Sequence, residues 1–205
     1  MKETVERIID LKKDNREEIL LDLGCGNKKI NKDYIGIDAI NYDAVDICGD
    51  VFEILSFFPR GSVKRIVALH FIEHIDDLEK LLSLIDRCLM KDGSVEFIAP
   101  HFSNPYFFSD PTHKTFFGLY TFCYFLESDL FRREVPKYEF NFSMELESVD
   151  LVFKSPKPFY LSYILKKILS LPFNLNYFFR ETYEQWFSNI LPCYEIIYKI
   201  KKNEN

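Results

Sequence analysis

The amino-acid sequence predicts an α/β fold built on a doubly wound, mostly parallel sheet. Apolar runs alternate with helical patterns or long connections over the first hundred residues, and this alternation is typical of parallel strands joined by crossovers. Polar residues follow directly after several of these runs, where the carboxyl ends of parallel strands form ligand sites. The length of 205 residues is enough for one domain with a full hydrophobic core.

The first hundred residues contain most strands of this sheet. Residues 3–18 are polar, with apolar residues at helical spacing, and predict an amphipathic helix. Short apolar runs predict strands at residues 18–23, 34–38, 44–47, 63–69 and 94–99. Apolar residues at i, i+3, i+4 and i+7 predict a helix over residues 78–89, ended by the turn at 91–93. Pro100 stops the fifth strand.

The sequence changes in character after Pro100. Residues 101–135 carry much of the aromatic content of a chain that is 17% Phe, Trp and Tyr, and we expect an aromatic insertion of loops and helix there. The expected elements that follow are a strand or strand pair at 140–153, helices at 159–170 and 174–190, and a closing strand at 193–200. One domain is therefore expected over residues 1–205. Its parts are the first half of the sheet at 1–100, the insertion with the strand and helices that follow at 101–192, and the closing strand at 193–200.

Composition and charge exclude several classes of protein. The formal net charge is -6 and the pI is near 5.3, so no domain-wide basic field would attract nucleic acid. Five cysteines without a CxxC pair predict reduced thiols in a cytoplasm. The amino-terminal segment is charged throughout and does not resemble a signal peptide. The apolar stretch at 168–179 is far shorter than the roughly 20 residues of a membrane span, and a soluble protein is expected.

Five polar residues mark the expected strand ends, and each of them follows an apolar run: Asp22, Asp38, Asp50, His70 and His101. A single polar residue at such a place is ordinarily a turn former. Five in corresponding places predict that one edge of the sheet carries a ligand site.

The turn after the first strand is the sharpest local signal. Gly24 and Gly26 in LLDLGCG allow the backbone to approach a ligand closely, because neither residue has a Cβ. The dinucleotide fingerprint GxGxxG requires a third glycine, and Lys29 occupies that position. The sequence therefore disfavours an NAD-dependent oxidoreductase.

Two carboxylates are placed to recognise a nucleoside. Asp38 closes the second strand, where it could accept hydrogen bonds from the two vicinal hydroxyls of a ribose. Asp50 closes the third strand and could accept from an adenine amino group, with the Val51 N–H beside it.

Successive motifs resemble those of the class I S-adenosylmethionine-dependent methyltransferases. They lie in order over about residues 18–100 and read LLDLGCG, YIGID, CGD, HFIEHI and DRCLMKDG. APHFSNP followed by FSDPTHKTFF resembles a bacterial subgroup found among cell-surface polysaccharide genes. The resemblance implies a seven-stranded Rossmann-like sheet whose last strand is antiparallel, with the aromatic insertion after the fifth strand. It also implies S-adenosyl-L-methionine as cofactor and O-methylation of a small acceptor such as a sugar or surface-glycan precursor.

The resemblance also implies which residues line the cofactor: Asp22, Gly24, Cys25, Gly26, Asp38, Asp50, Val51 and Leu69. Three departures from the family pattern accompany it. The segment at 27–33 is too short for the usual first helix, Lys64 replaces a common acidic residue, and residues 90–93 read MKDG instead of KPGG.

All four histidines lie within 44 consecutive residues, at positions 70, 74, 101 and 113. Transfer to a hydroxyl requires removal of its proton, and histidine titrates in a suitable range. His70, His101 and His113 are the expected candidates for the catalytic base, with Asp110 placed to orient His113. His74 is interpreted as a structural brace. His70, His74 and a carboxylate could form a metal site, but the HExxH pattern is absent, and no metal is expected.

Several alternatives stay open. An N-methyltransferase or another small-molecule methyltransferase differs only in the acceptor. A non-catalytic protein of the same fold could bind adenosyl ligands or a partner enzyme. The aromatic residues after Pro100 could form the core of the insertion or a wall that stacks on a sugar ring.

Overall fold

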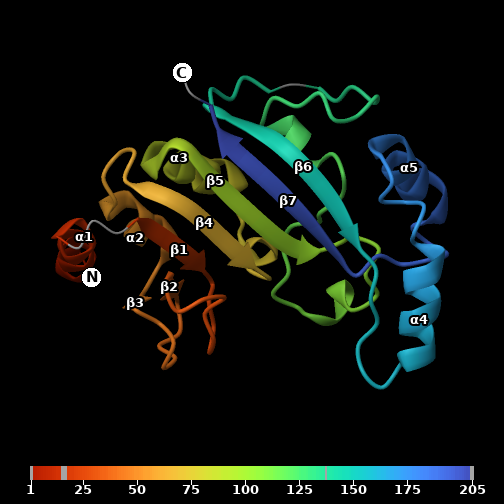
Figure 1. The fold of residues 1–205 in the computed structure, drawn as a ribbon, viewed down its shortest axis with the longest axis horizontal. Helices are drawn as coiled ribbons and strands as arrows, with labels where there is room; N and C mark the ends of the chain where they lie inside the picture. Colours follow the sequence, from red (N-terminus) through yellow and green to blue (C-terminus); the bar gives the residue numbers. More distant parts are fainter. Residues whose placement is uncertain (1, 15–17, 137, 204–205) are drawn as a thin grey trace.

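A computed structural model describes residues 2–14, 18–136 and 138–203, which form a seven-stranded sheet in the order β3-β2-β1-β4-β5-β7-β6 (Figure 1). The strands are β1 (Ile19–Leu23), β2 (Ile35–Asp38), β3 (Ile47–Cys48), β4 (Val63–Leu69), β5 (Leu89–Pro100), β6 (Met144–Val152) and β7 (Glu195–Lys202). Strands β1 to β5 pair in parallel, whereas β7 runs antiparallel to both β5 and β6. This arrangement confirms the predicted mostly parallel sheet with an antiparallel last strand.

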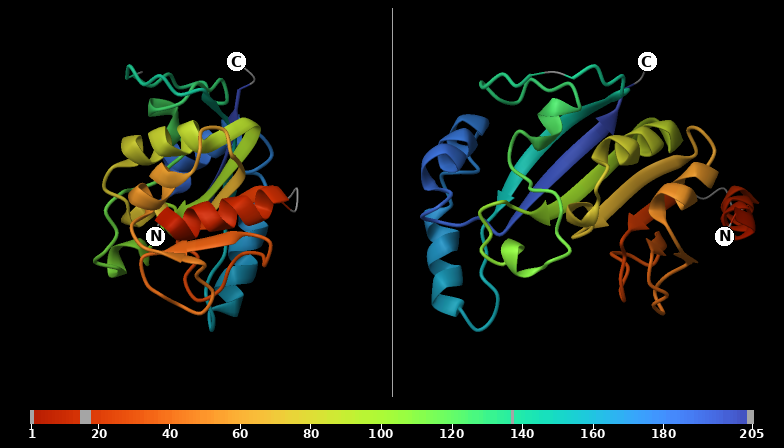
Figure 2. Two further views of the ribbon diagram at one scale, coloured as in Figure 1. Left: turned by 90° about the vertical axis from the view of Figure 1, so that its left-hand side faces the viewer. Right: turned by 180° about the vertical axis from the view of Figure 1, so that it is seen from behind.

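Five α-helices accompany the sheet in the described part of the chain: α1 (Lys2–Asp14), α2 (Val51–Phe57), α3 (Leu78–Cys88), α4 (Tyr160–Leu169) and α5 (Tyr177–Thr182). Short turns of other helix types are η1 (Ile72–His74), η2 (Phe107–Ser109), η3 (Thr121–Tyr124) and η4 (Tyr183–Phe187). Helices α1 and α2 lie near the β3 end of the sheet, and α4 and α5 lie beyond β6 at the opposite end (Figures 1 and 2). Of the predicted first helix, residues 15–17 lie outside the described residues.

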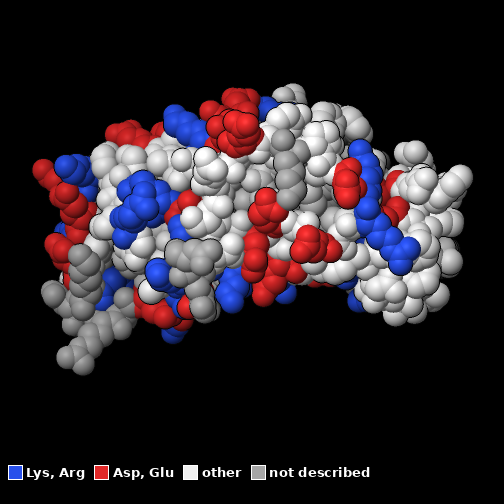
Figure 3. Space-filling model, turned by 90° about the horizontal axis from the view of Figure 1, so that it is seen from above, with Lys and Arg blue, Asp and Glu red and all other residues white. Residues whose placement is uncertain are grey.

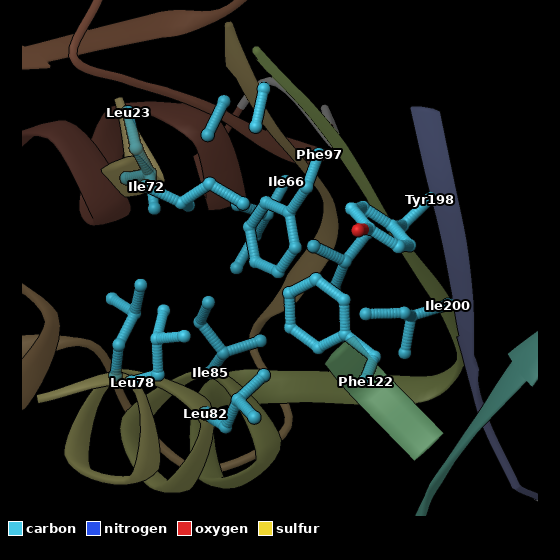
Figure 4. Packing of buried hydrophobic residues seen from close by; sticks show 14 of the residues in the cluster. Leu23, Ile66, Ile72, Leu78, Leu82, Ile85, Phe97, Phe122, Tyr198 and Ile200 are labelled. Atoms are coloured by element: carbon cyan, nitrogen blue, oxygen red, sulfur yellow. The ribbon is translucent and has the colours of Figure 1, made fainter. Parts of the chain in front are cut away.

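The main core lies between the sheet and α3. Leu82 and Ile85 from α3 face Phe97 of β5 and Tyr198 of β7, with Phe122 of the insertion between them (Figure 4). All five side chains are almost completely buried. The rings of Phe122 and Tyr198 meet edge to face with centroids 4.6 Å apart, a favourable geometry for aromatic pairs. Much of the aromatic excess after Pro100 therefore builds the core.

The structure differs from the predicted elements at three places. Residues 91–93 lie inside β5, where they pair with neither β4 nor β7 and Asp92 takes a φ of 57°, instead of ending the preceding helix. The insertion contains only the short turns η2 and η3 where loops and a helix were expected. Helix α2 was not predicted, because seven residues are too few to show a helical period. No helix among the described residues has the length and apolar character needed to cross a membrane.

Candidate active site

The carboxyl ends of β1 to β4 border a cavity of about 280 Å³. Four of the predicted cofactor residues line it: Gly24, Asp38, Asp50 and Val51. They come from three apolar runs that are separate in sequence, and the parallel sheet brings their ends together. His74, from the turn after β4, lines the opposite side of the same cavity.

The glycine turn after β1 has a conformation that few other residues could adopt. Gly24 has a φ of 68°, and a Cβ on it would lie 2.4 Å from Cδ2 of Phe71. Its N–H donates to the carbonyl of Ile37 at 2.8 Å, which ties the turn to β2. Gly26 has a φ of 57° and donates its N–H to Oδ2 of Asp38 at 2.9 Å. The turn therefore holds the Asp38 carboxylate beside the glycine backbone.

The two predicted carboxylates of the cavity, Asp38 and Asp50, keep free hydrogen-bonding capacity. Oδ1 of Asp38 accepts from the Ile40 N–H at 2.9 Å, and a carboxylate offers about four acceptor positions in all. Lone pairs therefore remain on both oxygens of Asp38 for a ligand. Oδ1 of Asp50 caps α2 by accepting from the Glu53 N–H at 3.0 Å.

His70 is held between two carboxylates at the end of β4. Its Nε2 lies 2.8 Å from Oε1 of Glu195, which also accepts from Lys154 at 2.6 Å. Its Nδ1 lies 3.4 Å from Oε1 of Glu73. The hydrogen bond to Glu195, with the weaker contribution of Glu73, raises the pKa of His70 to about 9. The ring is therefore a cation at neutral pH and has no free lone pair to accept a proton.

His101 is completely buried at the end of β5. Its Nδ1 accepts from the Ser103 N–H at 3.1 Å, so the remaining proton lies on Nε2, which is 3.8 Å from Glu184. Burial lowers the pKa of His101 to about 3. The side chain is neutral and has no surface that an acceptor could reach.

His74 and His113 face each other with ring centroids 5.0 Å apart. Nδ1 of His113 lies 2.8 Å from the carbonyl of Phe107, and Nδ1 of His74 lies 3.0 Å from the Thr112 hydroxyl. The structure therefore joins the turn after β4 to the FSDPTHK segment of the insertion. The backbone does the same, because Lys114 and Thr115 both donate N–H groups to the Glu73 carbonyl.

Comparison with known families identifies the kind of protein that has this site. The family described as methyltransferase domain matches residues 1–141 of the chain. The chain belongs to this methyltransferase family. The match confirms the class I resemblance and S-adenosylmethionine as the cofactor. No curated protein matches the sequence.

Solved structures share the fold of this methyltransferase at low sequence identity. An S-adenosylmethionine-dependent methyltransferase from Archaeoglobus fulgidus matches with a TM-score of 0.54 and 18% identity over 97% of this chain and 94% of its own. The YcgJ protein of Bacillus subtilis matches with a TM-score of 0.53 and 16% identity over the whole of both chains. A phosphoethanolamine N-methyltransferase of Haemonchus contortus, in complex with S-adenosyl-L-methionine, matches with a TM-score of 0.50 and 15% identity over 98% of this chain and 52% of its own.

The residues of the cavity fit this cofactor. Four aspartates line it, among them Asp38 and Asp50, and the one lysine, Lys114, is paired with Asp76. A negatively charged lining suits a ligand that carries a sulfonium and an ammonium group. The glycine turn provides the close backbone approach that a bulky nucleoside needs.

The other predicted cofactor residues of the methyltransferase are not among those that line this cavity. Asp22 is buried, and its Oδ2 accepts from the Ile30 N–H at 2.7 Å, so it shapes the short 27–33 loop. Cys25 is buried as well, and burial raises its pKa to about 11. Leu69 is exposed at the end of β4. Their role in cofactor binding stays a prediction.

Sequence reasoning missed three carboxylates of the methyltransferase: Glu73, Glu184 and Glu195. Glu73 lies beside His74 in HFIEHI, so the pairing of an acid with a histidine was a visible signal. Glu195 opens the last strand and reaches His70 from 125 residues away, which no local pattern could indicate. Glu184 lines a separate cavity of about 690 Å³ with Arg133 and Tyr120, on the side of α5.

Proposed function

We propose that this methyltransferase transfers the methyl group of S-adenosylmethionine to a hydroxyl of a sugar or surface-glycan precursor in a bacterial cytoplasm. The observation that carries the proposal is that the Asp38 cavity and the His74–His113 pair share one wall. A nucleoside site and a pair of histidines then flank the position of the reacting methyl. The sugar acceptor is supported by the resemblance of APHFSNP and FSDPTHKTFF.

The cofactor side of the proposal gives each residue one task. Asp38 accepts hydrogen bonds from the ribose hydroxyls, and Asp50 with the Val51 N–H recognises adenine. Gly24 and Gly26 keep side chains out of the space that the methionine portion needs. When bound, S-adenosylmethionine supplies an activated methyl group and its own leaving group.

The acceptor side must remove the hydroxyl proton. Of the three predicted bases, His101 is buried and His70 is held as a cation. His113 uses Nδ1 for its hydrogen bond to Phe107, and its Nε2 lies 3.7 Å from Oδ2 of Asp110, the residue expected to orient it. We therefore place deprotonation beside His113, and we add His74, whose Nδ1 is likewise engaged and which lines the cavity. Proton removal at a positioned side chain contributes roughly 10²–10⁴-fold to a rate.

Ligand binding tests the cofactor assignment directly. S-adenosylmethionine and S-adenosylhomocysteine should raise the melting temperature, and NADH should not, because only a ligand of the native state stabilises it. Absence of a shift with both adenosyl compounds at millimolar concentration would contradict the enzyme proposal.

Methyl transfer to a panel of acceptors tests the substrate class. Nucleotide-linked sugars should accept a methyl group, and the matched deoxy-sugars should not. His113→Ala should slow turnover by at least tenfold while the Kd for S-adenosylmethionine stays within about twofold. Transfer to amino-sugars or phosphoethanolamine in place of hydroxyl acceptors would show an N-methyltransferase. Cofactor binding without transfer to any acceptor would favour a non-catalytic binding protein.

A further inference from the structure

We propose that Glu73, His74 and His113 bind a divalent transition-metal ion of the zinc class. One potential ligand atom from each residue lies within 4.8 Å of the other two. Glu73 and His74 belong to the turn after β4, and His113 belongs to the insertion, so the ion would join two segments. Two imidazole nitrogens and one carboxylate oxygen are a ligand set that zinc sites use.

The hydrogen bonds of the two imidazoles leave their Nε2 atoms available. The carbonyl of Phe107 can only accept, so Nδ1 of His113 carries the proton. The Thr112 hydroxyl donates to Asp110 at 2.6 Å, so it accepts from Nδ1 of His74. In each ring Nε2 is therefore the atom that can ligate an ion, and Nε2 of His113 lies 3.7 Å from Oδ2 of Asp110. A ligating histidine ordinarily donates its other ring N–H to an oxygen in this way.

The Glu73 carboxylate provides an independent indication of a cation. The residue is completely buried, and neither carboxylate oxygen has a hydrogen-bond partner. Nδ1 of His70 lies 3.4 Å from Oε1 as an ion-pair partner, whereas Oε2 has no partner. A buried carboxylate oxygen without a partner is costly, and coordination of Oε2 to an ion would reduce that cost. Ligand atoms around a tetrahedral ion lie about 3.4 Å apart, so small side-chain rotations would complete the site.

The position of these residues suggests a role for the ion in deprotonating the acceptor. This role rests on the proposed methyl transfer. His74 lines the cofactor cavity, and three protein ligands leave a fourth position open. With the ion bound, the Nε2 lone pairs of His74 and His113 would be occupied, so an acceptor hydroxyl at the open position would lose its proton to water and not to His113. The acceptor oxygen would then bond to the methyl carbon as the methyl–sulfur bond breaks, and sulfur would retain the electron pair.

Cobalt substitution tests the site without measuring activity. Chelator-treated protein should bind Co²⁺ at micromolar concentration with the visible absorption of a tetrahedral site, and Zn²⁺ should displace it. Glu73→Gln and His113→Ala should each weaken binding by at least tenfold. Cys48→Ser, which removes an exposed thiol elsewhere, should leave binding unchanged.

Two outcomes would overturn the metal proposal. One is the absence of Co²⁺ or Zn²⁺ binding to folded protein, shown to be folded by its stabilisation with S-adenosylmethionine. The other is binding that survives both ligand variants or disappears in Cys48→Ser. Neither outcome would contradict the proposed methyl transfer, because the shift in melting temperature with S-adenosylmethionine does not depend on the ion.

A different surface carries a second inference. Helix α4 has no buried residue, and many large apolar side chains of residues 159–190 are exposed. They are Phe159, Tyr160, Leu161, Tyr163, Ile164, Leu165, Ile168, Leu169, Leu171, Leu175, Phe178, Trp186, Phe187 and Ile190. We call them the α4–α5 surface. The end of the molecule that carries α5, at the right of Figure 3, shows few charged residues on the face in view. Contiguous apolar surface of this extent marks an interaction site.

The charges beside the α4–α5 surface indicate the chemistry of its partner. Residues 151–190 contain five Lys and Arg residues and two acidic residues, Glu181 and Glu184, in a chain whose net charge is -6. Arg180 and Lys154 are paired with acidic groups, whereas Lys157 and Lys167 are exposed among the apolar residues. We infer that this surface docks on an anionic lipid bilayer, since aromatic and aliphatic residues with lysines are typical of interfacial helices. A second copy of the chain would instead bring lysines against lysines.

The length and position of α4 fit an interfacial placement. Its ten residues span about 15 Å, half the thickness of a bilayer core, so the helix would lie along the surface. It begins eight residues after the end of β6, which runs parallel to β1–β5. Docking would therefore place the carboxyl end of β6 beside the lipid.

Flotation with vesicles tests this inference. The protein should float with vesicles of phosphatidylcholine mixed with phosphatidylglycerol, and less with phosphatidylcholine alone or at high salt. Leu161→Glu combined with Ile168→Glu should reduce the bound fraction at least fivefold. Ile40→Glu, at an exposed apolar residue of the opposite end, should not. No flotation with anionic vesicles, or a dimer in solution that the double variant dissociates, would overturn the lipid proposal.

Discussion

Asp38 combines a structural and a binding task in one carboxylate. It accepts the N–H groups of Gly26 and Ile40, and its remaining lone pairs face the cavity. Asp38→Ala should therefore weaken S-adenosylmethionine binding by at least tenfold and lower the free energy of unfolding by about 1–3 kcal/mol, because the partly buried Gly26 N–H and the exposed Ile40 N–H lose their acceptor. Calorimetric titration and urea denaturation measure the two effects.

A control separates this effect from a general loss of charge. Asp43→Ala removes an exposed carboxylate of the neighbouring loop and should change neither quantity measurably. Unchanged cofactor affinity in Asp38→Ala would show that the carboxylate only shapes the glycine turn.

Glu184 should make stability depend on pH. Burial raises its pKa to about 7, despite the opposing hydrogen bond from the Leu119 N–H and the charge of Arg133. Between pH 4.5 and 7 the folded protein binds more protons here than the unfolded chain, so the contribution of Glu184 to stability falls as pH rises through this range. The loss is of the order of 3 kcal/mol at most.

Denaturant unfolding of Glu184→Gln and the parent across this pH range measures the effect. The variant should lose less stability between pH 4.5 and 7, because its amide does not titrate. His101, whose lowered pKa acts in the opposite direction, is common to both proteins, so the difference reports Glu184. Parallel pH curves would contradict the prediction.

The strand-end residues show which features of the site could be predicted from the sequence and which could not. Asp38, Asp50 and Gly24 were predictable, because their place depends on local apolar runs and on the rule that parallel strands end at one edge. The burial of His101 was not, because it depends on the insertion folding back so that Phe102 pairs with Phe117. The protonation of His70 likewise depends on Glu195 of the last strand.

The elements differ in predictability for a similar reason. Strand β4 (Val63–Leu69) agrees with the predicted residues 63–69, because its apolar residues 66–69 are typical of a buried central strand although Lys64 and Arg65 precede them. Strand β3 is reduced to two residues at the sheet edge, where few hydrogen bonds define it. Strand β5 begins five residues earlier than predicted, because polar residues 91–93 resemble a turn although they continue the strand.

One side chain joins the α4–α5 segment to the edge of the sheet. Asn174 accepts from the Leu151 N–H at 3.1 Å and donates to the Leu151 carbonyl at 2.6 Å, and it also holds Arg180. It thereby pairs with the edge strand β6 as a neighbouring strand would. Asn174→Ala should lower stability by about 1–3 kcal/mol and increase proteolytic cleavage within residues 153–190.

Limited proteolysis with mass spectrometry of the fragments tests this role. Asn189→Ala, at an exposed position of the same segment, serves as the matched control and should leave the cleavage rate unchanged. Equal cleavage of Asn174→Ala and the parent would mean that apolar packing, through Phe153 and Phe173, holds the segment without this contact.

At the scale of the molecule, the cofactor cavity and the α4–α5 surface lie at opposite ends of one sheet (Figure 1). The sheet connects them, because β7 is hydrogen-bonded both to β5 and to β6 along its length. We therefore expect residues 1–205 to unfold as one cooperative domain. Trp186 is the single tryptophan of the chain and lies in η4, directly after α5, so its fluorescence reports the α4–α5 segment.

Two probes of the same denaturant titration test this expectation. Trp186 fluorescence and far-ultraviolet circular dichroism should give coincident transitions. Saturating S-adenosylmethionine should move both midpoints equally, because a ligand of the native state stabilises the whole cooperative unit; at 100 times Kd the gain is about 2.7 kcal/mol. A fluorescence transition that comes earlier and does not respond to the cofactor would show that the α4–α5 segment unfolds independently, and the chain would then comprise two cooperative units.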